Sequence, residues 1–130
     1  MTALDTNVLV RLVTADDPAQ AERAAEVFRS SRLWVAKTVL VETEWVLRYS
    51  YGLDQEAICG TFRKLLGYGP LEVEDRAAVL RALEWLEAGM DWADALHLAS
   101  SGPAERFVTF DRGLVARAGG LKTAPPAELL

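Results

Sequence analysis

The sequence predicts an α/β fold, a three-layer sandwich in which helices flank a central, mainly parallel sheet. Two observations carry this prediction. Short apolar or alternating runs recur between longer segments of helical periodicity, so strands and helices alternate along the chain. No linker, repeat or low-complexity segment interrupts the 130 residues, of which 51% are hydrophobic. We therefore expect one domain, residues 1–130, with a substantial core.

In the first half of the chain we expect two strands and four helices. Thr38 and Asp54 are suitable N-caps, and Pro18 is tolerated in a first helical turn. Gly52 and the sequence GYGP at 67–70 end the helices that precede them. In order, the expected elements are a strand Thr2–Asp5, a helix Asn7–Thr14, a helix from Asp17-Pro18 to Ser30, a strand Leu33–Ala36, a helix from Thr38 to Tyr49 and a helix from Asp54 to Leu66.

In the second half, the alternating sequence LEVE predicts a strand at 71–74, and Asp75 is placed to cap the helix that follows. Apolar residues of that helix recur at helical spacing, and Gly89 fits its C-terminal stop. The sequence RFVTF is the clearest strand of the chain. The expected elements are a strand 71–74, a helix 76–88, a helix Trp92–Ser100, a strand 106–110, a short helical turn 111–120 and a last strand 121–123.

Composition narrows the classes of function. The net charge of −5 and the sequence pI near 4.9 argue against non-specific coating of nucleic acid. No apolar run approaches the roughly 18 residues of a membrane span, and Asp5 and Arg11 interrupt any signal-peptide core. Cys59 is the single cysteine, which suits a reducing cytoplasm, and with one histidine, His97, a structural zinc site is not expected.

Four carboxylates follow strands or begin helices on what should be one edge of the sheet. Asp5 and Asp111 come directly after predicted strands, Glu42 lies one turn into the helix after the second strand, and Asp94 lies in the first turn of another helix. In parallel α/β sheets, sites form at the carboxyl ends of strands. We therefore expect these four carboxylates to meet in one place.

Each of these acids also has a purely structural interpretation. Asp111 could cap the helix that follows it, and Asp5 could form an Asx turn. Asp91 is a natural N-cap, with Asp94 at a position that the helix dipole favours. Glu42 projects from an apolar helix face without a local cation.

Glu44 has Arg48 four residues on and is expected to form a solvated ion pair. Glu42 is therefore the helix carboxylate that we select for the site. Converging carboxylates repel one another unless a hard divalent cation such as Mg²⁺ or Mn²⁺ binds between them. Thr6, Asn7 and Thr109 could support such a cation or bind its water ligands.

Four segments together resemble the PIN-domain family, and most closely its VapC-like ribonuclease toxins of toxin–antitoxin pairs. These are LDTNVLVRL near the start, VLVETEWVLR at 39–48, GMDWADALHLAS at 89–100 and FVTFDRGL at 107–114. They occur in the family's order over nearly the whole chain. Trp92 stands where the family more often has phenylalanine.

The resemblance implies a Mg²⁺- or Mn²⁺-dependent endoribonuclease in which a metal-activated water hydrolyses the RNA phosphodiester. It implies that Asp5, Glu42, Asp94 and Asp111 hold the metal, with Asp91 as an additional acid. It also implies a homodimer and an antitoxin whose tail occupies the acidic groove. As residues that bind the RNA backbone, we select Arg11, Arg48 and Arg112.

Two other classes of function stay open at this point. One is a receiver-like signalling module with an acidic Mg²⁺ pocket, for which a second acid directly after the first strand is missing. The other is a non-catalytic binding protein on the same fold. For the tryptophans we expect core or dimer packing rather than RNA stacking; they are Trp34, Trp45, Trp85 and Trp92.

Overall fold

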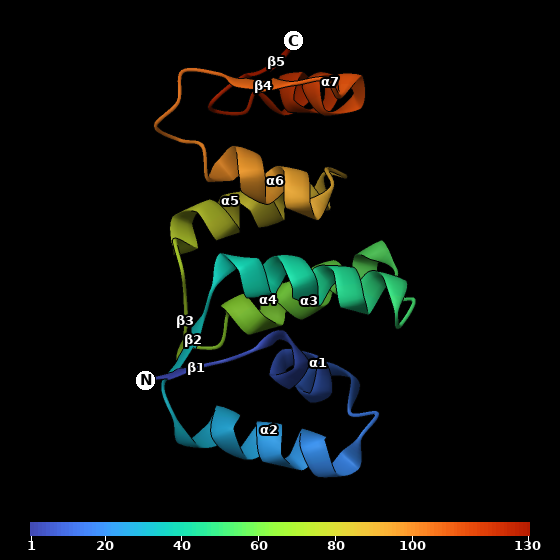
Figure 1. Ribbon diagram of the computed structural model, residues 1–130, viewed down its shortest axis with the longest axis vertical. Helices are drawn as coiled ribbons and strands as arrows, with labels where there is room; N and C mark the ends of the chain where they lie inside the picture. Colours follow the sequence, from blue (N-terminus) through green and yellow to red (C-terminus); the bar gives the residue numbers. More distant parts are fainter. The chain divides into compact units, whose positions relative to one another are not determined.

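Strands and helices alternate along the chain, as the sequence predicts. The computed structural model covers residues 1–130 and divides into two compact units, Met1–Arg76 and Ala77–Leu130. All strand pairs are parallel, so the α/β class is confirmed (Figure 1). None of the helices has the length and apolar character that crossing a membrane requires. The elements are β1 Thr2–Ala3, α1 Thr6–Thr14, α2 Pro18–Ser30, β2 Leu33–Val35, α3 Lys37–Tyr49, α4 Gln55–Leu66, β3 Leu71–Val73, α5 Arg76–Glu87, α6 Trp92–Ala99, β4 Phe107–Thr109, α7 Arg112–Leu121 and β5 Ala127–Leu129.

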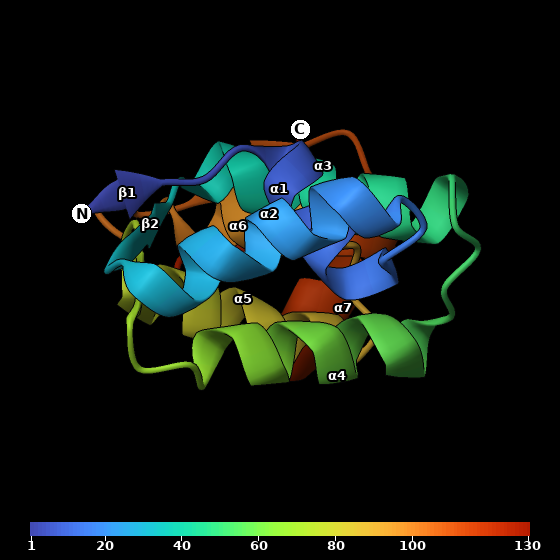
Figure 2. The ribbon, with the colours of Figure 1, turned by 90° about the horizontal axis from the view of Figure 1, so that it is seen from below.

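The first unit is built on a three-stranded sheet of order β1-β2-β3. Leu33 in the middle strand pairs with Thr2 on one side and with Leu71 on the other. Leu33 and Val35 are fully buried, as expected for an apolar strand with neighbours on both sides. Helix α1 packs against both α2 and α3, and α1 and α2 lie side by side (Figure 2).

Of the two N-caps predicted in this unit, Asp54 is confirmed and Thr38 is not, and Asp17 at the predicted start of α2 is a further N-cap. Asp17 accepts a hydrogen bond from Gln20 N at 3.1 Å, and Asp54 accepts one from Ala57 N at 2.9 Å. Both are N-caps that satisfy a free N–H of the first turn. The prediction for Thr38 is wrong: α3 begins at Lys37, its N-cap is Ala36, and no side chain caps it.

The prediction that Asp75 is an ordinary N-cap of α5 is also not met. Asp75 has a φ of +50°, in the left-handed region, whereas an N-cap residue is normally extended. Its carboxylate lies 3.2 Å from Lys37 Nζ, so an ion pair between the β3–α5 turn and the start of α3 uses this side chain.

The second unit contains the two-stranded sheet β4–β5, in which Phe107 pairs with Ala127. Helix α7 packs against both strands. Helix α5 ends at Glu87 and is closed by Gly89, whose φ is +102°. The Gly89 N–H donates to the Leu86 carbonyl at 2.9 Å, and the Met90 N–H donates to the Trp85 carbonyl at 2.9 Å. This pair of bonds is the Schellman motif, so the predicted glycine stop is confirmed.

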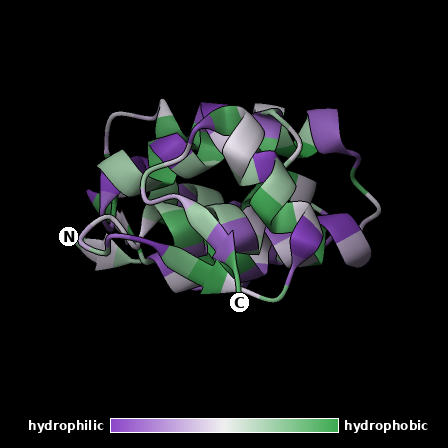
Figure 3. Cartoon of the chain, turned by 90° about the horizontal axis from the view of Figure 1, so that it is seen from above, coloured by the Kyte–Doolittle hydropathy of each residue, from purple (hydrophilic) through white to green (hydrophobic).

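The end of the chain differs from the sequence prediction in two ways. Residues 112–121 form a full helix rather than a short turn, and the strand expected at 121–123 is absent. Leu121 still belongs to α7, and Lys122 terminates it in the left-handed region at φ 53°. The last strand lies at Ala127–Leu129, where it pairs with β4. Hydrophobic and hydrophilic residues alternate along the helices that Figure 3 shows.

Candidate active site

The end of β1 presents an acid and a hydroxyl whose oxygens are not used by the fold. Asp5 is the N-cap residue of α1, but its side chain makes no capping bond and is exposed. Thr6 is only 3% exposed, and its Oγ1 is buried with no hydrogen-bond partner. Buried hydroxyls are nearly always hydrogen-bonded, because leaving one unpaired costs about 1–3 kcal/mol. An unpaired one beside a free carboxylate therefore marks this segment as a candidate ligand site.

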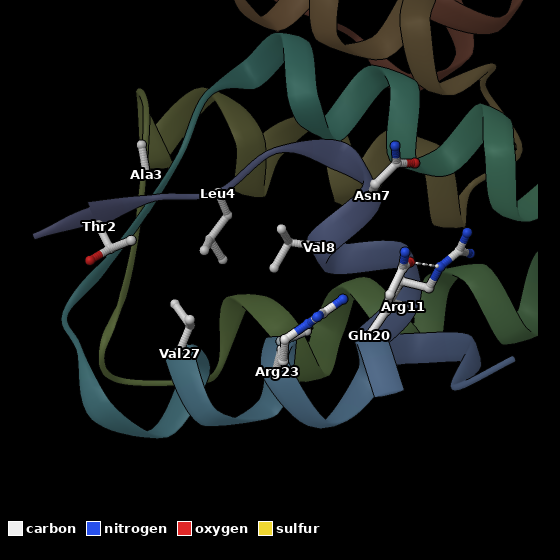
Figure 4. Close-up of a pocket in the computed structure, with 10 residues that line it drawn as sticks. Thr2, Ala3, Leu4, Asn7, Val8, Arg11, Gln20, Arg23 and Val27 are labelled. Atoms are coloured by element: carbon white, nitrogen blue, oxygen red, sulfur yellow. Dashed lines mark hydrogen bonds between the residues drawn. The ribbon is translucent and has the colours of Figure 1, made fainter. Parts of the chain in front are cut away.

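Asn7 extends this segment to the wall of a pocket. The pocket has a volume of about 370 Å³ and lies between β1, α1 and α2 (Figure 4). Its walls are mainly apolar, with Leu4, Val8 and Val27 among them, and no carboxylate lines it. Arg23 on its rim is exposed, a feature for which the sequence holds no local signal.

The two acids of α3 have opposite environments. Glu42 is exposed and forms no ion pair, whereas Glu44 is 7% exposed and accepts a hydrogen bond from Arg48 Nε at 2.6 Å. The predicted Glu44–Arg48 pair is confirmed, but the prediction that it is solvated is wrong. Glu44 lies four residues after Leu40 and three before Leu47, both fully buried, so helical spacing places it on the buried face. The burial of Glu44 could therefore have been predicted from its spacing to these two leucines.

Two acids of the second unit, Asp91 and Asp111, lie close enough to Asp94 to act on it electrostatically. Asp91 caps α6 by accepting from Asp94 N at 3.1 Å, and Asp111 caps α7 by accepting from Leu114 N at 3.0 Å. Burial raises the pKa of Asp94, and the charges of Asp91 and Asp111 raise it further. Negative charge thus accumulates around Asp94, which is what a cation site requires.

The side chain of Thr109 helps to fix the turn between β4 and α7. Its Oγ1 accepts a hydrogen bond from Asp111 N at 3.0 Å, directly after β4. The capping bond of Asp111 and this bond together restrain the turn from β4 into α7. Both capping interpretations raised by the sequence, for Asp91 and for Asp111, are therefore correct. One oxygen of a carboxylate suffices for a cap, so the cap does not remove the residue as a metal ligand.

The four predicted metal ligands fall into both units. Asp5 and Glu42 belong to the first, Asp94 and Asp111 to the second. Within neither unit does a group of three or more acidic, histidine or cysteine side chains lie close enough together to hold a metal ion. The convergence of the four carboxylates therefore stays a prediction. Their oxygen donors are the type that Mg²⁺ and Mn²⁺ prefer.

Two of the three arginines proposed to bind RNA are already engaged by other side chains. Arg11 bonds Gln20 at 2.7 Å, Tyr51 at 2.9 Å and Asp16 at 3.1 Å. Arg48 bonds Gln55 at 2.8 Å in addition to its buried glutamate. Arg112, at the start of α7, is exposed and forms no ion pair.

Residues 2–120 match the model of one family, described as the PIN domain. No curated protein matches the chain. No solved structure matches it.

Proposed function

The chain belongs to the PIN-domain family, and from that premise we propose that it is a Mg²⁺- or Mn²⁺-dependent endoribonuclease. PIN domains are, in general, metal-dependent nucleases that act on nucleic acid. The observation that carries the proposal is the extent of the match: residues 2–120 include all four predicted acids and run through both compact units. For the same reason we propose that the two units form a single functional domain.

The residues present fit a hard divalent cation. All four proposed ligands are carboxylates, and Asp5 and Glu42 are exposed and outside the ion pairs of the first unit. The orphaned Thr6 Oγ1 beside Asp5 adds a further oxygen that the protein itself leaves unpaired. When bound, the cation would supply a Lewis acid that activates water and neutralises developing charge on the phosphate.

The chain's own residues would bind the cation, hold its ligands in place and bind the RNA backbone. Asp5, Glu42, Asp94 and Asp111 would hold the cation through carboxylate oxygens. Asp91 would keep the first turn of α6, and with it Asp94, in place through its bond to Asp94 N. Asn7 and Thr109 would support the same groups, the latter through its bond to Asp111 N. Arg112 is the arginine that we favour for the phosphate backbone, because Arg11 and Arg48 already have carboxylate partners.

The cleavage assay tests this proposal directly. Purified protein should cleave a labelled RNA with Mg²⁺ or Mn²⁺ and stop when EDTA is added. Asp5→Asn should reduce the rate by at least about a hundredfold, because a metal ligand is lost while an exposed side chain is changed conservatively. Asp54→Asn is the matched control, since it alters an equally exposed acid that only caps a helix. Undiminished cleavage in EDTA, or by the Asp5→Asn protein, would refute the mechanism.

We also propose the finer assignment to the toxin of a toxin–antitoxin pair, acting in the cytoplasm as a homodimer. Its support is the order of the four motifs that resemble the VapC-like toxins. Expression of the chain should arrest growth, and co-expression of a short open reading frame next to its gene should relieve the arrest. Growth arrest by the Asp5→Asn protein would argue against toxicity through cleavage.

A further inference from the structure

Two aromatic side chains stand on the solvent face of α3. Trp45 is 57% exposed and Tyr49 is 67% exposed, whereas Trp85 and Trp92 are 8% and 1% exposed. Core packing, one of the two roles expected of the tryptophans, is therefore confirmed for Trp85 and Trp92 and is wrong for Trp45. The ring centroids of Trp45 and Tyr49 lie 5.6 Å apart, with the ring planes tilted by 45°. We call these two residues the aromatic pair. Large aromatic side chains lose much of their potential stabilisation when left in water, so this exposure calls for a physical reason.

Helix α3 holds the aromatic pair on a fixed support. Leu40 and Leu47, on its opposite face, are 1% and 0% exposed. Because its other face is packed in this way, α3 cannot turn the two rings inward without exposing its buried leucines. The packing of α3 therefore holds the two rings on its solvent face.

The aromatic pair lies on the same helix face as a proposed metal ligand. Trp45 is three residues after Glu42 and Tyr49 is four after Trp45, the spacing at which side chains are neighbours along a helix. Glu42 is itself exposed. A ligand held by a cation at Glu42 would thus have an aromatic surface within one turn of the helix.

The size of this surface favours a small planar occupant over a second copy of the chain. Among residues 1–76, Met1 is the only other exposed large hydrophobic residue. Two aromatic side chains of about 150–250 Å² each, partly exposed, offer on the order of 300 Å². A stable protein interface buries about 800 Å² per partner, of which roughly 450 Å² is apolar. A nucleobase, by contrast, needs only one ring face on which to stack.

We propose that the aromatic pair stacks an unpaired base of single-stranded RNA beside the site of cleavage. The location beside the cleavage site rests on the proposed function; the stacking itself does not. Stacking is tolerant of sequence because every base has a π-face, so this contact would select single strands over duplex rather than one base over another.

The test is binding of a labelled, single-stranded 2′-O-methyl oligoribonucleotide, which is resistant to cleavage, to the full chain in Mg²⁺. Trp45→Ala and Tyr49→Ala should each bind it roughly tenfold more weakly, the loss typical of one stacked base. Trp45→Phe should retain most of the affinity, because it keeps a ring, whereas Trp45→Leu should not. An abasic strand of the same length should bind the unaltered protein as weakly as the base-containing strand binds Trp45→Ala.

Three results would overturn the stacking proposal. These are equal binding of the abasic and base-containing strands, unchanged binding by Trp45→Ala, and a fall in sedimenting mass that accompanies weaker binding by Trp45→Ala. The last result would identify the aromatic pair as an interface between copies of the chain. Thermal melts of each variant confirm folding, which exposed substitutions should preserve.

The stacking proposal and the nuclease proposal can fail separately. If the Trp45→Ala protein cleaves RNA with unchanged KM while Asp5→Asn is inactive, stacking is refuted and the nuclease stands. If the unaltered protein does not cleave RNA but binds it in a base-dependent manner that Trp45→Ala removes, the aromatic pair is supported and the nuclease is refuted.

Discussion

Substitution of Asp111 separates its structural role from its proposed chemical one. Its side chain accepts a hydrogen bond from Leu114 N at 3.0 Å and so caps α7, and its carboxylate is also a proposed metal ligand. Asparagine caps helices about as well as aspartate, whereas alanine loses the bond at a cost of about 1 kcal/mol. We therefore expect Asp111→Asn to fold with nearly unchanged stability and to lose metal-dependent cleavage. Asp111→Ala should lose metal-dependent cleavage and also about 1 kcal/mol of stability.

The size of the expected effect on stability follows from the length of the chain. For a domain between 100 and 150 residues, a loss of about 1 kcal/mol lowers Tm by roughly 3–4 °C. Thermal melts in EDTA measure this difference without any contribution from bound metal. The matched control is Asp54, which caps α4 through Ala57 N at 2.9 Å and has no proposed role in the site. Asp54→Asn and Asp54→Ala should repeat the pattern of stability while leaving cleavage unchanged.

Two outcomes would contradict this reasoning. A Tm for Asp111→Asn as low as that of Asp111→Ala would show that the capping bond does not account for the stability at this position. Full cleavage activity in Asp111→Asn would show that the carboxylate is not a required ligand, and the family resemblance would then have assigned Asp111 wrongly.

Two further predictions concern pH and have opposite signs. The pKa of Asp94 is raised by burial and by the charges of Asp91 and Asp111, so the ionised carboxylate opposes folding. Without metal, the free energy of unfolding should therefore fall as pH rises from 3.8 through the pKa of the folded state. Asp94→Asn should have a higher Tm than the unaltered protein at neutral pH but not in acid. A lower Tm of Asp94→Asn at neutral pH in EDTA would refute this. The pKa of Asp16 is lowered, chiefly by the hydrogen bond that the Tyr51 hydroxyl donates at 2.6 Å. The ionised carboxylate should therefore stabilise the fold above pH 3.8, and this stabilisation should be lost as pH falls through the pKa of the folded state. Asp16→Asn should therefore melt earlier than the unaltered protein at neutral pH, with the two Tm values converging in acid; a difference that persists in acid would contradict it.

The sequence by itself was sufficient for most of the local interactions. The predicted caps at Asp54, Asp91 and Asp111 each join a side chain to a backbone N–H three residues on. Such a bond depends on the residue type and on its position before a helix, both of which can be read directly. The glycine stop of α5 was predictable for the same reason, since turn chemistry is also a local signal. The parallel pairing of the first three strands is not local, and it was predictable from the alternation of strands and helices along the chain.

The sequence alone did not locate the last strand. Both 121–123 and 127–129 are short and partly apolar, and only pairing with β4 distinguishes them. Thr38 shows the same limit at a helix start, because its hydroxyl suits an N-cap but the chain enters α3 one residue earlier, at Lys37. A residue type that suits an N-cap does not act as one when the helix starts before it, as α3 does before Thr38.

Tertiary structure alone decided which polar and aromatic groups are free to act. Arg11 is engaged by Tyr51, which is 40 residues away in sequence, and this removes it from the surface available to RNA. Packing buries Glu44 and leaves Glu42 and Trp45 exposed on the same helix. Residue type and short-range order thus determined the fold class and the candidate acids. Burial and long-range partners depend on how distant segments pack. They determined which of the candidate side chains are exposed and free of hydrogen bonds and ion pairs to other residues.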